Sequence, residues 1–170
     1  MALADIKLMV FDVDGVLTDG RLYYGPDGEA LKVFHVRDGE GLKRLASAGI
    51  EVALLSARDS AALRRRAAEL GISRLVTGRP EKGPALAALA AELGLSPAQV
   101  GYAGDDLLDL PAMRLAGWTA CPADAAAEVR AAADFVAALP GGAGAGREIA
   151  EQLLRSTGRW DAATADVRGE

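Results

Sequence analysis

The sequence predicts an α/β fold in which a doubly wound parallel sheet carries a small β-hairpin insertion. Two observations support this prediction. Short, nearly continuous apolar runs, which are typical of buried parallel strands, recur along the chain. A stretch of helical character, rich in Ala, Leu or Arg, follows each of the strongest runs. Strands that alternate with helices in this way form βα units on a parallel sheet.

The clearest strand is the run 6–11, which ends at Asp12. The same pattern recurs at 51–55, which ends at Ser56, and at 100–103, which ends at a Gly-Asp-Asp sequence. We predict weaker strands at 74–77, 118–121 and 135–136. We predict helices at 38–48, 59–70, 84–93, 107–115, 125–132 and 146–155.

An insertion interrupts this alternation between the first strand and the first helix. Segments 21–24 and 30–34 indicate two short strands, and the Gly-Pro-Asp-Gly sequence between them is typical of a tight turn. We therefore expect a β-hairpin over about 21–34, which is too short to form a domain. The expected organisation is a single domain over 1–157 and a disordered or separately docked tail over 158–170.

The composition narrows the possible functions. Of the 170 residues 51% are hydrophobic and 25% charged, and the formal net charge of -5 argues against general binding to nucleic acid or anionic membranes. One Cys and one His cannot form Cys/His zinc sites or disulfide frameworks, so carboxylates are the preferred catalytic groups. Because no run has the roughly 18 apolar residues of a membrane span, and acidic residues interrupt the N-terminal region, we expect a cytoplasmic protein.

Polar residues gather where the predicted strands end. In a parallel sheet these ends share one edge, where open α/β sheets bind their ligands. The candidate residues there are Asp12, Asp14, Ser56, Ala57, Arg58, Lys82, Asp105, Asp106 and Asp109. Each taken alone has an ordinary explanation, since Asp and Ser cap turns and helices and Lys is common on surfaces. Together, in loops of one sheet edge, they indicate a functional site.

These loops resemble the four motifs of the haloacid dehalogenase-like phosphatase superfamily. The motifs are Asp-x-Asp-x-x-x-Thr at 12–18, a Ser at 56, a Lys at 82 and Gly-Asp-Asp-x-x-Asp at 104–109. The resemblance implies that Asp12 is a nucleophile that forms an aspartyl-phosphate. It also implies that Asp14 is the general acid for the leaving alkoxide and then the general base for water.

The resemblance further implies a Mg²⁺ site, since hard oxygen ligands suit this ion. Its ligands would be the Asp12 carboxylate, the Asp14 main-chain carbonyl and the Asp105 carboxylate. Ser56 and the Ala57 amide would bind the phosphoryl oxygens, and Lys82 would neutralise charge and orient Asp12. Asp106 and Asp109 would hold metal-bound waters or Lys82, and the sequence leaves open which of the two does so.

Further stretches resemble the 3-deoxy-D-manno-octulosonate 8-phosphate phosphatases of lipopolysaccharide synthesis, over about residues 5–157. These stretches are 12–20, 34–39, 104–109 and 141–148. The resemblance implies a phosphatase without a cap domain, and a homotetramer in which the hairpins pack into a ring and a neighbouring C-terminal segment shields the site. A substrate with a carboxylate and a phosphate would suit four arginines as partners, namely Arg58, Arg37, Arg79 and Arg147. At Ala143, where such phosphatases usually carry a basic residue, the chain departs from the pattern.

Other functions stay open at this stage. The close alternative substrate is a nine-carbon sugar acid such as 2-keto-3-deoxynononate 9-phosphate, whose phosphatases share the hairpin and the catalytic loops. A more distant alternative is a phosphoacceptor module, but its phosphorylated Asp would follow the third strand, and no Asp directly follows 74–77. A non-catalytic scaffold is the last alternative, and the intact set of motif residues argues against it.

Overall fold

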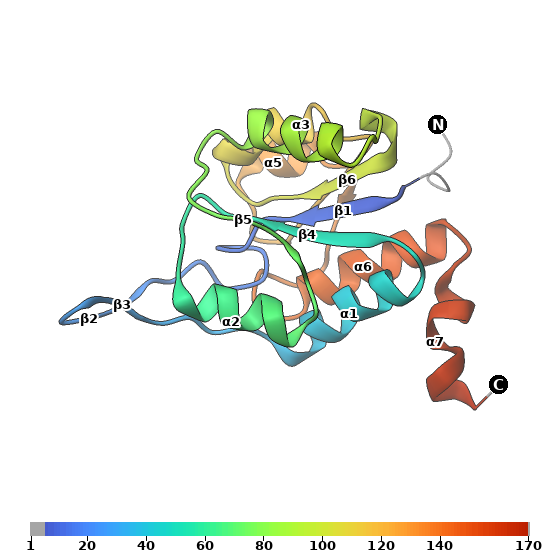
Figure 1. The fold of residues 1–170 in the computed structure, drawn as a ribbon, viewed down its shortest axis with the longest axis horizontal. Helices are drawn as coiled ribbons and strands as arrows, with labels where there is room; N and C mark the ends of the chain where they lie inside the picture. The colour runs from blue at the N-terminus through green and yellow to red at the C-terminus, as the bar shows by residue number, and fades with distance from the viewer. Residues whose placement is uncertain (1–5, 170) are drawn as a thin grey trace.

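The computed structural model describes residues 6–169, and its centre is a six-stranded parallel sheet (Figure 1). The strand order is β5-β4-β1-β6-β7-β8. The strands are β1 (Leu8–Phe11), β4 (Glu51–Leu55), β5 (Arg74–Val76), β6 (Val100–Ala103), β7 (Trp118–Cys121) and β8 (Phe135–Val136). The predicted α/β fold is confirmed, because every strand expected in the main sheet is present and all of its pairings are parallel.

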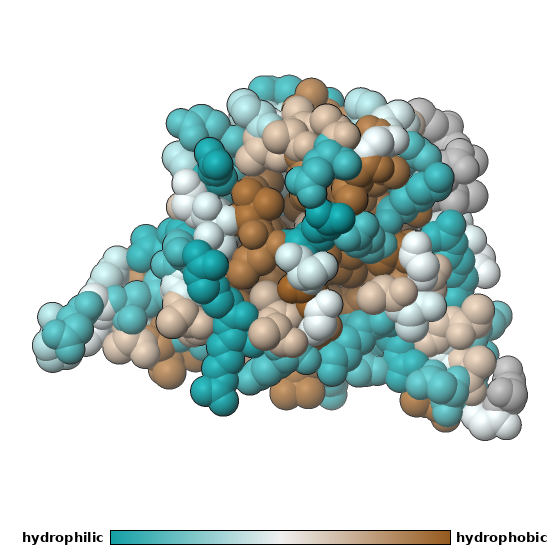
Figure 2. Space-filling model, in the orientation of Figure 1, coloured by the Kyte–Doolittle hydropathy of each residue, from teal (hydrophilic) through white to brown (hydrophobic). Residues whose placement is uncertain are grey.

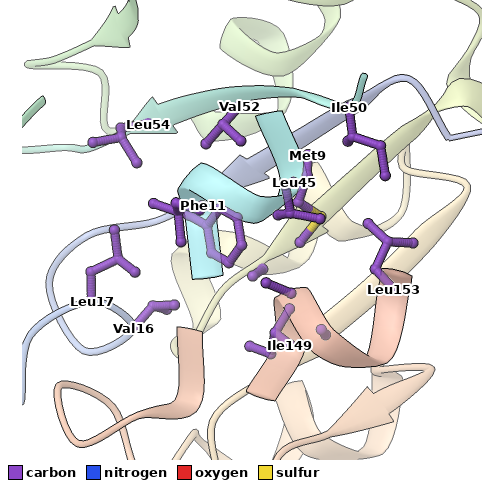
Figure 3. Packing of buried hydrophobic residues seen from close by; sticks show 14 of the residues in the cluster. Met9, Phe11, Val16, Leu17, Leu45, Ile50, Val52, Leu54, Ile149 and Leu153 are labelled. Atoms are coloured by element: carbon purple, nitrogen blue, oxygen red, sulfur yellow. The ribbon is translucent and has the colours of Figure 1, made fainter. Parts of the chain in front are cut away.

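Helices cover both faces of the sheet because side chains alternate along its strands. Met9 and Phe11 belong to the core of one face, and Leu8 and Val10 to the core of the other. The first face packs against α1 (Val36–Ser47), α2 (Ala61–Glu69) and α6 (Ala145–Ser156). The second packs against α3 (Lys82–Glu92), α4 (Leu110–Met113) and α5 (Ala127–Ala132). Figure 1 shows the two layers, and Figure 3 shows the packing of the first around Phe11 and Ile149.

Small residues bring α1 and α6 close together. A Cβ atom on Gly41 of α1 would lie 2.9 Å from the Cα atom of Arg147 of α6. The backbone N–H of Arg147 donates a hydrogen bond of 2.9 Å to the buried Asp38 carboxylate. This carboxylate therefore satisfies one of the free N–H groups in the first turn of α6, which links the two helices.

The predicted hairpin is present between β1 and α1 and projects from the body of the protein (Figure 1). It consists of β2 (Tyr23–Gly25) and the antiparallel β3 (Gly28–Leu31). The second strand ends at Leu31, earlier than the expected 34. The chain turns towards the body of the protein here, and only 4% of the next side chain, that of Lys32, is exposed. Within residues 6–169 the hairpin is the one insertion between β1 and α1.

Two segments differ from the sequence expectation. The helix expected at 107–115 is divided into a 3-10 turn, η3 (Leu107–Asp109), and the short α4, because Pro111 in the first turn of α4 favours a new helix start there. The tail forms a helix, α7 (Trp160–Arg168), that contacts α1 and α6. Arg147 and Arg155 lie over the Trp160 ring, and Ala163 is buried. The described part of the tail thus includes a helix that packs against its own domain.

Exposed large apolar side chains occur both along the hairpin region and elsewhere on the described surface, as at Leu108 and Val167. No helix within residues 6–169 is long and apolar enough to cross a membrane. Figure 2 shows a largely hydrophilic face, with hydrophobic side chains visible between the two helical layers beside the edge strand β5. Exposed large apolar side chains occur along the hairpin and the segment after it, at Leu22, Tyr23, Tyr24, Leu31, Val33 and Val36.

Candidate active site

The candidate residues gather where the strand order changes direction. The chain runs from β1 to β4 and β5 on one side and then returns to β6 on the other. Phe11, the last residue of β1, pairs with Leu54 of β4 and with Ala103 of β6. The loops after these three strands therefore start side by side, and Asp12 is the first residue of the central loop. Such a switch point at the carboxyl edge is where open α/β sheets bind ligands.

Three carboxylates meet at this edge. Asp12, Asp105 and Asp109 each offer an oxygen atom within 4.8 Å of the others. Two glycines make this approach possible. A Cβ atom on Gly15 would lie 1.9 Å from Asp105 Oδ2, and one on Gly104 would lie 2.4 Å from the Asp109 side chain. Glycine is therefore required at both positions for the carboxylates to converge.

A buried lysine partly neutralises the cluster. Lys82 Nζ, at the start of α3, lies 2.8 Å from Asp12 Oδ2 and 2.6 Å from Asp109 Oδ1. Burial disfavours the charge on Lys82, but Asp12 and Asp109 outweigh this, so its pKa is raised. Three carboxylates against one ammonium leave a formal charge of -2 (one positive charge minus three negative). A divalent cation would balance this charge.

The pKa values of two of these carboxyl groups are raised, first by burial and then by the negative charge of their neighbours. Burial, and next the charge of Asp109, raise the pKa of Asp12 from 3.8 to about 6, with Lys82 opposing. Burial, and then Asp12 and Asp109, raise the pKa of Asp105 from 3.8 to about 8. The cluster offers closely spaced carboxylate oxygens with raised pKa values and a formal charge of -2. These properties fit a hard divalent ion such as Mg²⁺.

Of the two acidic residues whose roles the sequence left open, Asp109 contacts Lys82, and which of the two would hold metal-bound waters stays a prediction. The Asp109 carboxylate is fully buried and also accepts a hydrogen bond of 2.6 Å from the Tyr102 hydroxyl. The backbone N–H groups of Asp105 and Asp106 donate to its other oxygen at 2.9 and 3.0 Å. Asp106 is exposed, and its own carboxylate caps η3 by accepting from the Leu107 N–H.

Asp14 lies two residues after Asp12 in the loop after β1 and is paired with Lys32, which follows the hairpin. Its Oδ1 accepts from Lys32 Nζ, and its side chain is 20% exposed. Lys32 Nζ also lies 3.4 Å from Glu29 Oε1. Asp14 is therefore close in sequence to Asp12, and its side chain pairs with Lys32, a residue that belongs to none of the sequence motifs.

The loop after β4 holds the residues expected to bind the phosphoryl group. Ser56 is buried, and its Oγ accepts a hydrogen bond of 3.1 Å from the Arg58 N–H, which turns the chain around the half-buried Ala57. The Arg58 guanidinium reaches the hairpin, where it donates to the Tyr24 hydroxyl at 3.1 Å and to Glu29 at 3.4 Å. The hairpin thus contacts two of the loops at the sheet edge.

The other three arginines lie away from these contacts. Arg37 and Arg147 line a separate surface concavity together with Leu139, Gly144, Glu148 and Glu151. Arg147 is also paired with Glu151 at 2.5 Å on its own helix. Arg79 is exposed beyond β5, and its backbone N–H donates to Ser56 at 3.2 Å. Substrate binding by these three residues stays a prediction.

Three side chains at the site had no signal in the sequence. Tyr102 occupies a buried strand position, where an aromatic residue is ordinarily explained by packing alone. Lys32 and Glu29 belong to a short polar hairpin, where charged residues are ordinarily solvated. Only the positions of these side chains relative to Asp109, Asp14 and Arg58 reveal their contacts.

Comparison with known proteins gives consistent results. A family model of haloacid dehalogenase-like hydrolases matches residues 26–117. The 3-deoxy-D-manno-octulosonate 8-phosphate phosphatase of Haemophilus influenzae is 48% identical over 157 residues, which cover 92% of this chain and 87% of that protein. The phosphatase of the same name from Escherichia coli strain K12 is 42% identical over 94% of this chain and 85% of its own.

Solved structures agree with these relatives. The phosphatase of this name from Moraxella catarrhalis, in complex with a magnesium ion, a phosphate ion and a KDO molecule, is similar with a TM-score of 0.93 and 40% identity over 98% of this chain and 95% of that chain. The chain therefore belongs to the haloacid dehalogenase-like hydrolases and, among them, to the family of the 3-deoxy-D-manno-octulosonate 8-phosphate phosphatases.

Proposed function

We propose that this protein is a Mg²⁺-dependent phosphatase that hydrolyses 3-deoxy-D-manno-octulosonate 8-phosphate to the free sugar acid and inorganic phosphate, in lipopolysaccharide precursor synthesis. The observation that carries the proposal is the cluster of Asp12, Asp105, Asp109 and Lys82 at the carboxyl edge of the sheet, all buried except the half-buried Asp105. The relatives support the substrate, since those at 42 and 48% identity carry this activity in their names.

The residues that would hold Mg²⁺ are the carboxylates of Asp12 and Asp105 and the main-chain carbonyl of Asp14. Asp109 would not bind the ion directly, because its two oxygens already accept four hydrogen bonds, and it would instead hold Lys82 in place. When bound, the ion supplies positive charge to the transferring phosphoryl group and lowers the repulsion between this dianion and the carboxylates. Lys82 supplies the remaining positive charge and holds Asp12 in one orientation.

The chain's own residues would then carry out two displacements. An Asp12 oxygen attacks phosphorus while the bond from phosphorus to the sugar oxygen breaks, and the protonated Asp14 gives its proton to that oxygen. The Ser56 hydroxyl and the Ala57 N–H bind the phosphoryl oxygens during the transfer. In the second step Asp14 takes a proton from water, the water oxygen bonds to phosphorus, and the bond between phosphorus and Asp12 breaks.

The carboxylate end of the substrate would be bound by arginines. Arg58 is the best placed, because it follows the phosphate-binding residues Ser56 and Ala57 and lies between the site and the hairpin. Its buried Nε has no hydrogen-bond partner, so the guanidinium retains a donor for a ligand. Arg37, Arg79 and Arg147 stay candidates for binding the substrate.

A homotetramer in the cytoplasm is part of this proposal. The projecting hairpin exposes large apolar side chains, such as Tyr24, of which 63% is exposed, and Leu31, of which 55% is exposed. Apolar groups that protrude in this way on a short hairpin are suited to burial by other copies of the chain. Packing of hairpins against one another would also close the site, over which residues 6–169 form no cap domain.

A substrate panel tests the proposed function. Purified protein is assayed with the eight-carbon sugar-acid phosphate, with 2-keto-3-deoxynononate 9-phosphate and with simple phosphoesters, each with Mg²⁺ and with a chelator. We expect the highest kcat/KM with the eight-carbon substrate and no turnover with the chelator. Equal kcat/KM values on every phosphoester would contradict the assigned substrate, and full activity after chelation would contradict the metal.

A further inference from the structure

Lys32, at the end of the hairpin, places a buried ammonium group against Asp14 of the candidate active site. Lys32 comes directly after β3, and only 4% of its side chain is exposed. Its ammonium group donates to Asp14 Oδ1, across 18 positions of sequence. Lysine loses much side-chain entropy when it is fixed in this way, and a buried ammonium is stable only when it is paired. The contact therefore needs partners that hold the lysine in place.

A second carboxylate supplies that support. Glu29, on β3, places Oε1 3.4 Å from Lys32 Nζ, and only 14% of its side chain is exposed. Its other oxygen, Oε2, lies 3.4 Å from the Arg58 guanidinium. The chain of contacts runs Asp14, Lys32, Glu29, Arg58, and its formal charge is zero because two carboxylates face two cations. Both ends of this chain are residues of the sheet edge, and the middle belongs to the hairpin.

Anchoring of the hairpin alone does not account for Lys32. The hairpin is already attached to the loop after β4, because Arg58 donates to the Tyr24 hydroxyl at 3.1 Å and to Glu29. Lys32 instead reaches the loop after β1 and contacts the side chain of Asp14. That carboxylate is 20% exposed, so without Lys32 it would have room to rotate away from the site.

We propose that Lys32 is a positioning residue that holds the Asp14 carboxyl group in the orientation needed for proton transfer to the leaving oxygen. This inference rests on the acid and base role proposed above for Asp14. In the first displacement the proton passes from Asp14 to the sugar oxygen as the bond to phosphorus breaks. Lys32 keeps its own protons throughout and acts only through Asp14. The hairpin is thereby part of the catalytic apparatus of its own subunit.

The leaving group distinguishes this role from a structural one. An alkyl oxygen needs a proton as it leaves, whereas 4-nitrophenolate leaves without one. The test measures the first step alone, as acid-trapped phosphoryl-enzyme with the sugar-acid phosphate and as the burst of nitrophenolate with 4-nitrophenyl phosphate. We expect Lys32→Met to slow the first step about tenfold or more with the sugar phosphate, and less than about threefold with the aryl phosphate.

Matched variants keep the test decisive. Lys43→Met makes the same change at an exposed position of α1 and should leave both rates unchanged. If Lys32→Met does not fold, as judged by circular dichroism, Lys32→Gln takes its place. It keeps a donor but is too short to reach both carboxylates, and the ratio of alkyl to aryl rates should still fall. Equal loss with both substrates, or no loss, would overturn the role of Lys32.

The proposed substrate and this inference fail in different ways. A wild-type enzyme that does not hydrolyse the eight-carbon sugar phosphate contradicts the substrate alone. The ratio is then measured with whichever alkyl phosphate the wild-type enzyme hydrolyses fastest. A ratio that falls in Lys32→Met supports the positioning role there too, and an unchanged ratio overturns it.

Discussion

At the level of single residues, Lys82 shows how a buried positive charge is stabilised in this protein. A buried ammonium is costly unless it is paired, and here Asp12 and Asp109 lie at 2.8 and 2.6 Å. Asp109 is in turn held by the Tyr102 hydroxyl and by backbone N–H groups, so each member of the network has partners. The network therefore fixes the Asp12 carboxylate in one orientation, as the proposed role of Asp12 as the nucleophile requires.

Replacement of Asp12 tests the nucleophile directly. Asp12→Asn keeps the shape of the side chain but removes the anionic oxygen, and we expect kcat to fall at least about 1,000-fold. Rapid acid quench should trap phosphoryl-enzyme in the wild type and none in the variant. Asp27→Asn, an exposed change in the hairpin turn, is the control and should keep full activity. Near wild-type turnover of Asp12→Asn, with deamidation excluded by mass, would refute the assignment.

The raised pKa values of Asp12, about 6, and Asp105, about 8, predict how pH affects the metal-free protein. Both exceed the ordinary 3.8, so the folded state holds protons that the unfolded chain has released. The free energy of unfolding should therefore fall as pH rises from about 4 to about 8. Chemical denaturation at several pH values, with chelator present, measures this, and Asp105→Asn should flatten the dependence.

The affinity for Mg²⁺ should rise with pH, whereas the free energy of unfolding of the metal-free protein should fall. Because the ion competes with protons for Asp12 and Asp105, its affinity should rise between pH 6 and pH 8, and binding should release protons. Isothermal titration calorimetry in two buffers with different ionisation enthalpies measures the number of protons released. Asp27→Asn again serves as the control. An affinity that is independent of pH in this range would contradict the proposed ligands.

At the level of elements, the loop after β1 is seated on the segment that precedes α6. The two backbones touch: a Cβ atom on Gly141 would lie 1.9 Å from the Gly15 carbonyl oxygen, and one on Gly142 would lie 2.4 Å from the Asp19 nitrogen. The Gly142 N–H donates to the Val16 carbonyl at 3.1 Å. Only glycine permits this approach, so the segment keeps the loop that carries Asp14 in place.

A comparison of two glycines distinguishes the effect of this backbone contact from the effect of a strained backbone conformation alone. Gly142 has φ of 70° and Gly158 has φ of 68°, but only Gly142 has atoms in the way of a Cβ. Gly158→Ala should cost roughly 1 to 2 kcal/mol of stability and leave kcat unchanged. Gly142→Ala should cost more and should lower kcat about tenfold, because the catalytic loop must shift. Thermal melting and kcat of both variants check this, and equal effects would contradict it.

At the level of the whole molecule, the hairpin is the feature by which we propose that the site is linked to other subunits. Leu31→Asp places a charge among its exposed apolar side chains and should convert the proposed tetramer into smaller species. Val167→Asp on α7 is the matched control, since 67% of Val167 is exposed against 55% of Leu31. Size-exclusion chromatography with light scattering measures the mass. A wild-type protein that is monomeric, or an unchanged mass for Leu31→Asp, would contradict the tetramer.

The parts that the sequence predicts best are those in which neighbouring residues carry the information. The run 6–11 followed by Asp12 shows both the strand and the end at which the site lies, and the hairpin is visible from its turn residues. The α7 helix was not predicted, because its surroundings include Arg147 and Arg155 stacked on Trp160. The division of the helix expected at 107–115 was not predicted, although Pro111 in the first turn of α4 is a local feature that favours it.

The sequence by itself determined the parallel sheet, the edge where the site lies, and the family to which the motifs point. The tertiary structure decided which acidic residue contacts Lys82, and that Lys32 contacts Asp14. These pairs are 27 and 18 positions apart, and each depends on the angstrom-scale placement of separate elements. Strand and helix patterns are properties of contiguous residues, whereas a charge network arises only when several loops converge on one edge.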